Sequence, residues 1–181
     1  NNPMLGQADF SLLPVWFADR AELYYGGSSM ETGGGGLGGA VVINSLPGWD
    51  RKLYGSTTQG VGSYGLYQGF AELGGGSSRV QARVRLMYEE AQNDFRYYNT
   101  AVLPRRWMRQ TNAGYVKQGG TFDLFWKPGH KHMVTLSGWL MATGRNLPKS
   151  MTYEGRAGLE RQDDRDLRVA ASWSMYTYRL K

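Results

Sequence analysis

The sequence predicts a mostly β protein in which long antiparallel strands follow a small mixed α/β unit. Three observations carry this prediction. From Arg51 onward, apolar and polar residues alternate repeatedly, which is typical of strands with one apolar face. The connections between the alternating segments are short and long in turn. Before Arg51 the pattern is different, with a short helical segment and a glycine-rich stretch.

The first fifty residues combine several kinds of local structure. Ser11 is a candidate N-cap for a short helix over Leu13–Ala18, since serine side chains satisfy free backbone N–H groups at helix starts. Strands are expected at Arg20–Tyr25 and Ala40–Asn44, on either side of the glycine-rich stretch. Leu46-Pro47-Gly48 then ends this unit, because proline and glycine interrupt regular structure.

The strands after Arg51 are predicted from their period of two. In Arg79–Glu89 the apolar residues from Val80 to Tyr88 alternate with polar ones that include Arg83 and Arg85. A slip of one residue would exchange the two faces, so the alternation fixes which face each side chain occupies. By the same pattern, further strands are expected at Arg51–Gly60, Tyr64–Leu73, Thr111–Trp126, Lys131–Thr143 and Asp166–Tyr178.

The connectors favour a transmembrane β-barrel. Tight turns are expected at residues 74–78 and 127–130, and long connectors at residues 92–108 and 145–162. Short turns at one end and long loops at the other are typical of membrane barrels, and strands of about 9–11 residues can cross a bilayer. Six strands cannot close a large barrel, so the chain is expected to be a fragment. A soluble β-sandwich fits the alternation as well, but explains less readily the three arginines on one face of Arg79–Glu89.

Several other classes of function are not supported by the composition. The net charge is +6, but arginine and lysine are mixed with acidic residues along the chain, so no nucleic-acid partner is expected. No apolar run approaches the roughly 20 residues of a membrane helix. There is no cysteine, no paired nucleophile and base, and no nucleophile elbow. The protein is therefore expected to be a non-enzyme without a cofactor or a resident metal.

The glycine-rich segment Gly26–Asn44 does not have the features of a phosphate-binding loop. No lysine lies between Asn1 and Lys52, whereas a Walker loop needs one after its last glycine. The segment leads into a strand rather than a helix, which argues against a dinucleotide-binding loop. A flexible linker would be richer in serine. A tightly folded backbone remains as the explanation.

The residues around this segment resemble the C-terminal half of the plug domain of TonB-dependent outer-membrane receptors. The resemblance rests on these positions: Arg20, Glu22, Gly26, Ser28, Ser29, Gly38, Gly39 and Asn44. It implies that residues 1–46 belong to the plug, residues 47–50 connect it to the barrel, and residues 51–181 form the first six strands of a barrel of about 22 strands. The chain departs from the family at Tyr25-Gly26-Gly27, where Arg-Gly-Pro is usual, so the arginine's ion pairs with barrel carboxylates are not expected here.

The resemblance also implies a function. Such receptors import a scarce, large nutrient, namely cobalamin, an iron–siderophore or haem, across the outer membrane of Gram-negative cells. The implied partners are outer-membrane lipid, the energy-coupling TonB complex, the nutrient and, at the surface, a lipoprotein. The alternative is a soluble or surface β-sandwich module that binds carbohydrate or protein.

The barrel topology assigns the two faces of the strands. Residues expected to face lipid are Val80, Val84, Leu86, Phe122, Leu124, Val134, Leu136, Leu140, Leu167 and Val169. Residues expected to face the lumen are Arg79, Arg83, Arg85, Asp123 and Arg168, and these are interpreted as solvated or paired interior groups in preference to substrate ligands. Trp126, near a turn, is expected in an aromatic girdle.

Two segments are candidates for substrate binding. By resemblance, the plug loop supplies Asn2, Met4 and Gln7. The long outer loop supplies Asn93, Asp94, Arg96, Tyr97, Tyr98 and Trp107, because aromatic side chains with a few polar groups suit a bulky amphipathic ligand. Packing within the loop explains the same aromatic cluster equally well. Asp163, Asp164 and Asp166 could bind calcium, but the arginines that alternate with them favour ion pairing.

Overall fold

The computed structural model describes residues 15–25, 39–49, 51–152 and 159–177. Contacts within the chain divide it into two compact units, Asn1–Gly48 and Trp49–Lys181. The regular structure is almost entirely antiparallel β-sheet, as the alternation predicts. No helix in the described part of the chain is long and apolar enough to cross a membrane.

The first unit contains a short 3-10 helix, η2 (Val15–Phe17), and a two-stranded antiparallel sheet of β1 (Arg20–Tyr25) and β2 (Gly39–Asn44). Both strands lie where the sequence predicts them. The helix expected over Leu13–Ala18 is only this single turn within its described residues, and the proposed cap Ser11 lies outside them. Asp19 fastens the end of the sheet, since its backbone N–H donates to the carbonyl of Asn44 (3.3 Å).

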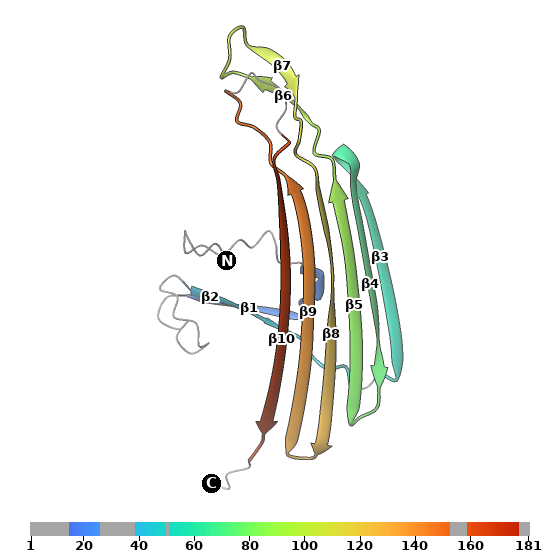
Figure 1. Ribbon diagram of the computed structural model, residues 1–181. Coiled ribbons are helices and arrows are strands. Elements are labelled where there is room, and N and C mark those ends of the chain that lie inside the picture. The colour runs from blue at the N-terminus through green and yellow to red at the C-terminus, as the bar shows by residue number, and fades with distance from the viewer. Residues whose placement is uncertain (1–14, 26–38, 50, 153–158, 178–181) are drawn as a thin grey trace. The chain divides into compact units, whose positions relative to one another are not determined.

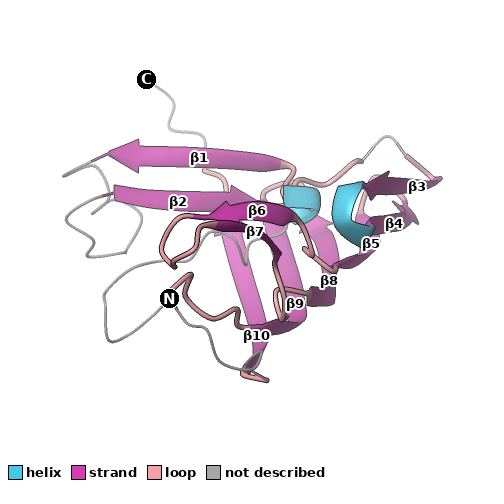
Figure 2. Ribbon diagram, turned by 90° about the horizontal axis from the view of Figure 1, so that it is seen from above, coloured by secondary structure: helices cyan, strands magenta, loops and turns pink. Residues whose placement is uncertain are grey.

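The second unit is a six-stranded antiparallel sheet in a single layer (Figures 1 and 2). Each strand lies beside the next along the chain, except that a loop carrying two short strands intervenes between β5 and β8. The strands are β3 (Leu53–Gly62), β4 (Leu66–Gly76), β5 (Val80–Ala91), β8 (Tyr115–Gly129), β9 (His132–Asn146) and β10 (Arg161–Met175). β3 and β10 form the edges, so the described sheet is open and does not close into a barrel.

Several strand ends differ from the prediction. β10 begins at Arg161, five residues before the predicted Asp166. The prediction missed these five residues because they are all polar and show no apolar alternation. β4 begins at Leu66, since Tyr64 lies in a short 3-10 turn, η4 (Ser63–Gly65), with a φ of 59°. β8 continues to Gly129 through an irregularity after Trp126, in the segment predicted to be a turn.

The connector predicted at residues 92–108 is not an unstructured loop. It contains β6 (Arg96–Asn99) and β7 (Arg106–Arg109), which pair antiparallel as a hairpin at one end of the large sheet (Figure 1). Four-residue strands give too few alternations for a periodic signal. The hairpin positions four of the six predicted loop residues on paired strands.

Candidate functional site

The large sheet is inside out compared with a sheet of a water-soluble protein. Along β5 the polar side chains are buried: Arg83 is 6% exposed and Arg85 is 1% exposed. Val84 and Leu86, which alternate with them, are 42% and 57% exposed. Directly paired residues on neighbouring strands lie on the same face of a sheet. The registers therefore continue both faces across the other strands.

The apolar face carries the residues expected to face lipid. Eight of these ten are exposed: Val80, Val84, Leu86, Phe122, Leu136, Leu140, Leu167 and Val169. Leu124 and Val134 are half-buried. In addition, Trp126 and Trp173 are both exposed, and each is paired directly with Val134 on the strand between them. The three residues thus form one row across the strands of this face.

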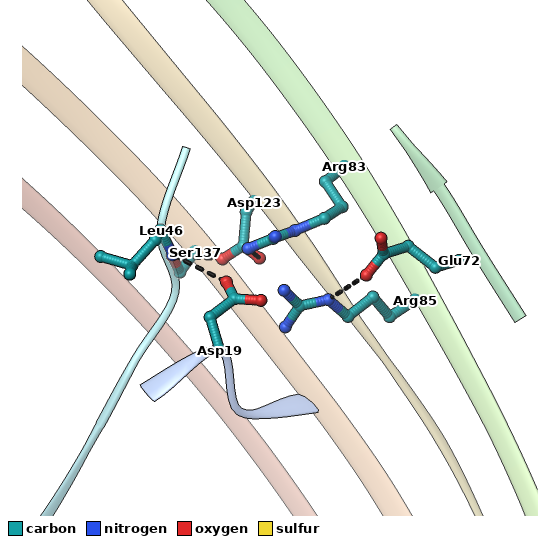
Figure 3. Close-up of polar contacts among 7 residues, drawn as sticks. All are labelled: Asp19, Leu46, Glu72, Arg83, Arg85, Asp123 and Ser137. Carbon is teal, nitrogen blue, oxygen red and sulfur yellow. Dashed lines mark hydrogen bonds and ion pairs between the residues drawn. The ribbon is translucent and has the colours of Figure 1, made fainter. Parts of the chain in front are cut away.

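Buried charges on the opposite face are paired with one another (Figure 3). The Arg83 guanidinium contacts the Asp123 carboxylate at 3.2 Å, and the Ser137 hydroxyl donates to the same carboxylate at 2.8 Å. Two residues further along β5, on the same face, Arg85 Nε donates to the Glu72 carboxylate at 2.8 Å. These pairs join β4, β5, β8 and β9, and they offset part of the large cost of burying ionised groups.

A second polar cluster on this face lies closer to the β6–β7 end of the strands. The Glu89 carboxylate accepts hydrogen bonds from Gln68 Nε2 and from the Tyr115 hydroxyl, each at 2.7 Å, and it lies 3.4 Å from Lys117 Nζ. Three neighbouring strands thus converge on one carboxylate. The face combines these paired polar groups with buried apolar side chains, among them Met87, Phe125 and Met141. A ligand would have to displace existing partners of the polar groups.

Two of the predicted lumen residues do not belong to the buried set. Arg79 lies just before β5 and is exposed, so its place in that strand was wrong. Arg168 is on the polar face but is exposed, and its guanidinium pairs with Asp166 two residues away. The interpretation of these arginines as paired groups is confirmed for Arg83, Arg85 and Arg168.

The β6–β7 hairpin brings together part of the predicted binding surface. Tyr98 and Trp107 are cross-strand partners whose ring centroids are 5.6 Å apart, and the Arg96 guanidinium lies 5.7 Å from the Trp107 ring. All three side chains are exposed, with Trp107 at 61%. Arg109 is the partner of Arg96 on the same face of the hairpin and is also exposed.

The other predicted loop residues hold the hairpin in place. The Asn93 amide donates to the carbonyl of Ala113 (3.1 Å) across the root of the loop. Asp94 pairs with Arg109, whose Nε also donates to the Asp94 carbonyl at 2.9 Å. Tyr97 is half-buried and its ring contacts Phe95. These residues therefore act in folding the loop.

Asn99 is a buried anchor that the sequence analysis missed. Its amide donates to the carbonyl of Met151 (2.9 Å), in the next long loop, while its side-chain oxygen accepts from the backbone N–H of Ala101 (2.9 Å). An asparagine among polar loop residues gives no sequence signal of burial. Arg109 was missed as well, because its place opposite Arg96 depends on the hairpin register.

We expect Asn99→Ala to loosen the hairpin. The change removes two hydrogen bonds from a buried side chain to part-buried backbone groups, which together contribute about 1–3 kcal/mol. Limited proteolysis of the full-length protein should then cut within residues 96–109 at least several times faster than in the wild type. The matched control is Thr100→Ala, at an exposed neighbour. Equal cleavage of the two variants would contradict the anchoring role.

The outer face of the hairpin, formed by Arg96, Tyr98, Trp107 and Arg109, is an exposed surface suited to binding. Aromatic faces stack on planar or apolar groups, and guanidinium groups form hydrogen bonds with carboxylates and phosphates. The segment 92–111 contains four arginines and one aspartate, so its surroundings are cationic. Such a surface favours an anionic ligand with rings or apolar groups.

The remaining predicted positions are placed as follows. Asn2, Met4 and Gln7 lie outside the described residues, and so do Gly26, Ser28, Ser29 and Gly38 of the plug-like motif. Arg20 and Asn44 are paired at the end of the β1–β2 sheet, and Arg20 Nε contacts the Glu22 carboxylate at 2.7 Å. Gly39 begins β2, opposite Tyr25. Leu46 follows β2 and donates its backbone N–H to the Asp19 carboxylate at 2.7 Å (Figure 3).

Two of the three aspartates of β10 form ion pairs, and Asp164 instead accepts hydrogen bonds from the Gln162 side-chain amide at 3.1 and 3.0 Å. Asp163 contacts Arg161 at 2.8 Å, and Asp166 pairs with Arg168. No group of three or more acidic or histidine side chains able to hold a metal ion occurs in the described parts of the chain. The alternation of arginine and aspartate thus produces the ion pairs that the sequence favours.

Comparisons with known proteins give no relative. No model of a known protein family matches the chain, and no curated protein is similar to it.

Proposed function

We propose that this chain is part of a TonB-dependent outer-membrane transporter that imports a scarce, large nutrient. In this proposal residues 1–46 belong to the plug, residues 47–50 connect it to the barrel, and residues 51–181 form part of the barrel wall. Energy would come from the TonB complex, and a surface lipoprotein is a further candidate partner.

One observation carries the proposal: the exposed face of the sheet is apolar, while the buried face carries ion-paired charged side chains beside a few apolar ones. Such a sheet suits lipid on one side and a polar lumen on the other. A β-sandwich places the apolar faces of two sheets against each other, which is the opposite arrangement. Among the described residues, the side chains of Arg85 and Asp123 are some of the most deeply buried, and a sandwich would not place them in its interior.

The dimensions of the apolar face support the same proposal. On this face eight residues separate Gln118 from Trp126, and Arg165 from Trp173. At about 3.4 Å per residue this distance is about 27 Å along the strands. A tilt of about 40° reduces it to about 21 Å, slightly less than the apolar band of about 25 Å in membrane barrels and in keeping with a thin outer membrane.

The strand lengths and edges also fit a larger barrel. Each of the six strands has at least 10 residues, enough to cross a membrane. The edge strands β3 and β10 leave long rows of backbone groups open to pairing. Long open edges are prone to pair with another strand, so we expect further strands of the same barrel to cover them.

The outer face of the hairpin is the proposed nutrient-binding surface. If the membrane lies across the large sheet, the hairpin extends beyond one end of it (Figure 1). Arg96 favours nutrients that carry carboxylate or phosphate groups, and Tyr98 with Trp107 favours a ring system. Arg109 is already paired with Asp94 and holds the hairpin beside them. Among cobalamin, iron–siderophores and haem, this surface favours those with anionic groups next to planar ones.

A direct binding experiment tests the proposal. The full-length protein would be titrated with cobalamin, iron–siderophores and haem, and Trp107→Ala should weaken binding of its nutrient at least tenfold, as loss of a central aromatic contact does in other interfaces. Leu103→Ala, at an exposed residue of the same loop, should have no effect. Absence of binding to all three classes, together with a soluble protein, would overturn the proposal.

A further inference from the structure

The exposed apolar face of the large sheet contains a groove of about 780 Å³. It crosses β5, β8, β9 and β10. Its apolar walls on this face come from four large side chains, Leu86, Phe122, Leu140 and Leu167. The groove therefore opens towards the same surroundings as the apolar face as a whole.

One of two glycines on this face leaves open space in the groove. Gly120 and Gly138 lie on the apolar face, since they pair with Leu86 and Phe122 respectively. A Cβ atom added at Gly138 would meet no other atom within 4 Å, whereas one at Gly120 would meet Leu86 at 2.9 Å. The missing side chain of Gly138 thus leaves open space in the middle of an otherwise filled surface.

Polar side chains line one end of the groove. Tyr88, Gln118 and Arg165 belong to the same row, linked through Ala142. The Tyr88 hydroxyl donates to Glu90 at 2.8 Å. Arg165 lies two residues beyond Leu167 on the same face, about 7 Å along the strand, where the apolar band ends.

Arg165 differs from the other two arginines of β10. Arg161 is paired with Asp163, and Arg168 with Asp166. Among the described residues, Arg165 has no carboxylate partner, and its side chain is exposed. Asp163, its nearest acidic neighbour on this face, is already neutralised by Arg161. The end of the groove therefore carries an uncompensated positive charge.

We propose that this groove binds an acyl chain of an anionic membrane lipid whose phosphate contacts Arg165. The inference rests on the proposed function, because it needs the apolar face to lie in a membrane. An arginine near the membrane interface costs little, about 0–1 kcal/mol, and guanidinium groups bind phosphate oxygens through two parallel hydrogen bonds.

The two parts of the site have different roles. An apolar groove in a bilayer does not choose between lipids, since all acyl chains are about as apolar as leucine. The groove fixes where the chain lies, and Arg165 selects the headgroup. One basic residue near an anionic lipid surface contributes enough for about a fivefold preference.

The test measures lipid binding to the full-length protein in a neutral detergent by native mass spectrometry. The probes are phosphatidylglycerol, phosphatidylcholine with the same acyl chains, and inorganic phosphate. The wild type should prefer phosphatidylglycerol about fivefold. Arg165→Gln should remove this preference and leave phosphatidylcholine binding unchanged, while Arg165→Lys should keep most of it.

A second variant tests the groove itself. Gly138→Leu places a side chain in the open space, where its Cβ meets no other atom within 4 Å, and should reduce retention of both lipids at least severalfold. Ala171→Leu adds the same apolar bulk elsewhere on this face and should not. The inference is overturned if Arg165→Gln keeps the preference, if the two leucine variants behave alike, or if inorganic phosphate alone competes fully. Membrane fractionation of the same protein distinguishes this failure from failure of the proposed function, which would leave the protein in the soluble fraction.

Discussion

Replacing Val84 by arginine is expected to destabilise the protein by about 2–4 kcal/mol when it is folded in a lipid bilayer. Val84 is exposed on β5 and lies in the middle of the apolar face, in the same row as Phe122, Gly138 and Val169. A guanidinium at this depth would have to leave water or distort the bilayer around it. Equilibrium unfolding by urea of the full-length protein in lipid vesicles measures the effect.

The same substitution at Val116 is the matched control. Val116 is an exposed valine on the same face, two residues beyond Gln118, in the row of Glu90 and Asp163. There an arginine should cost only about 0–1 kcal/mol, because the membrane interface solvates it. In a soluble protein both substitutions would change the free energy of unfolding by no more than about 0.5 kcal/mol, as substitutions at exposed positions usually do. Equal and small effects would therefore contradict the membrane assignment of this face.

The two faces of the strands could be predicted from the sequence because side chains alternate between the faces. Once one residue is assigned to a face, the faces of all other residues in that strand follow. The alternation from Val80 to Leu86 predicts that Val84 and Arg83 lie on opposite faces, and the exposures agree. The sequence does not reveal which residues pair across strands. Asp123 meets Arg83 only because β8 pairs with β5 past the intervening hairpin, and that register depends on the length and folding of the loop.

Short and polar strands were not predicted for a related reason. In β6 and β7 four residues per strand give no measurable period. In β10 the five residues before Asp166 are all polar, so hydrophobicity carries no signal there. The outer face of the hairpin is consequently only partly predictable. Arg96, Tyr98 and Trp107 are evident from composition, whereas the positions of Arg109 and Asn99 require the pairing of the two strands.

The groove on the apolar face shows a different limit of the sequence. Gly120 and Gly138 are part of the predicted alternation, where glycine merely interrupts an apolar series. Only the register and packing show that Leu86 covers Gly120, its direct partner, while the position of Gly138 stays open. A property of this kind belongs to the sheet and not to any single strand.

Replacing Asp123 by alanine is expected to have the largest effect on stability, about 3–5 kcal/mol. The Asp123 side chain is 2% exposed, contacts Arg83 at 3.2 Å and accepts a hydrogen bond from Ser137. The substitution removes the carboxylate beside the Arg83 guanidinium, which stays charged. Most of the desolvation cost of burying Arg83 remains, and the attraction to Asp123 no longer offsets it. Urea unfolding of the full-length protein in lipid vesicles measures the loss.

Asp166→Ala is the control for this second prediction, since it breaks the Arg168–Asp166 pair on the same face but at exposed side chains. Water already solvates these two charges, and exposed pairs typically contribute about 0–1 kcal/mol. The double variant Arg83→Met with Asp123→Leu should recover a large part of the stability lost in Asp123→Ala, because it removes both buried charges. If the double variant is instead as unstable as the sum of the separate changes, burial of unpaired charge is not what makes Asp123 necessary. The requirement would then lie in the hydrogen bond from Ser137 and the packing of β8 against β9.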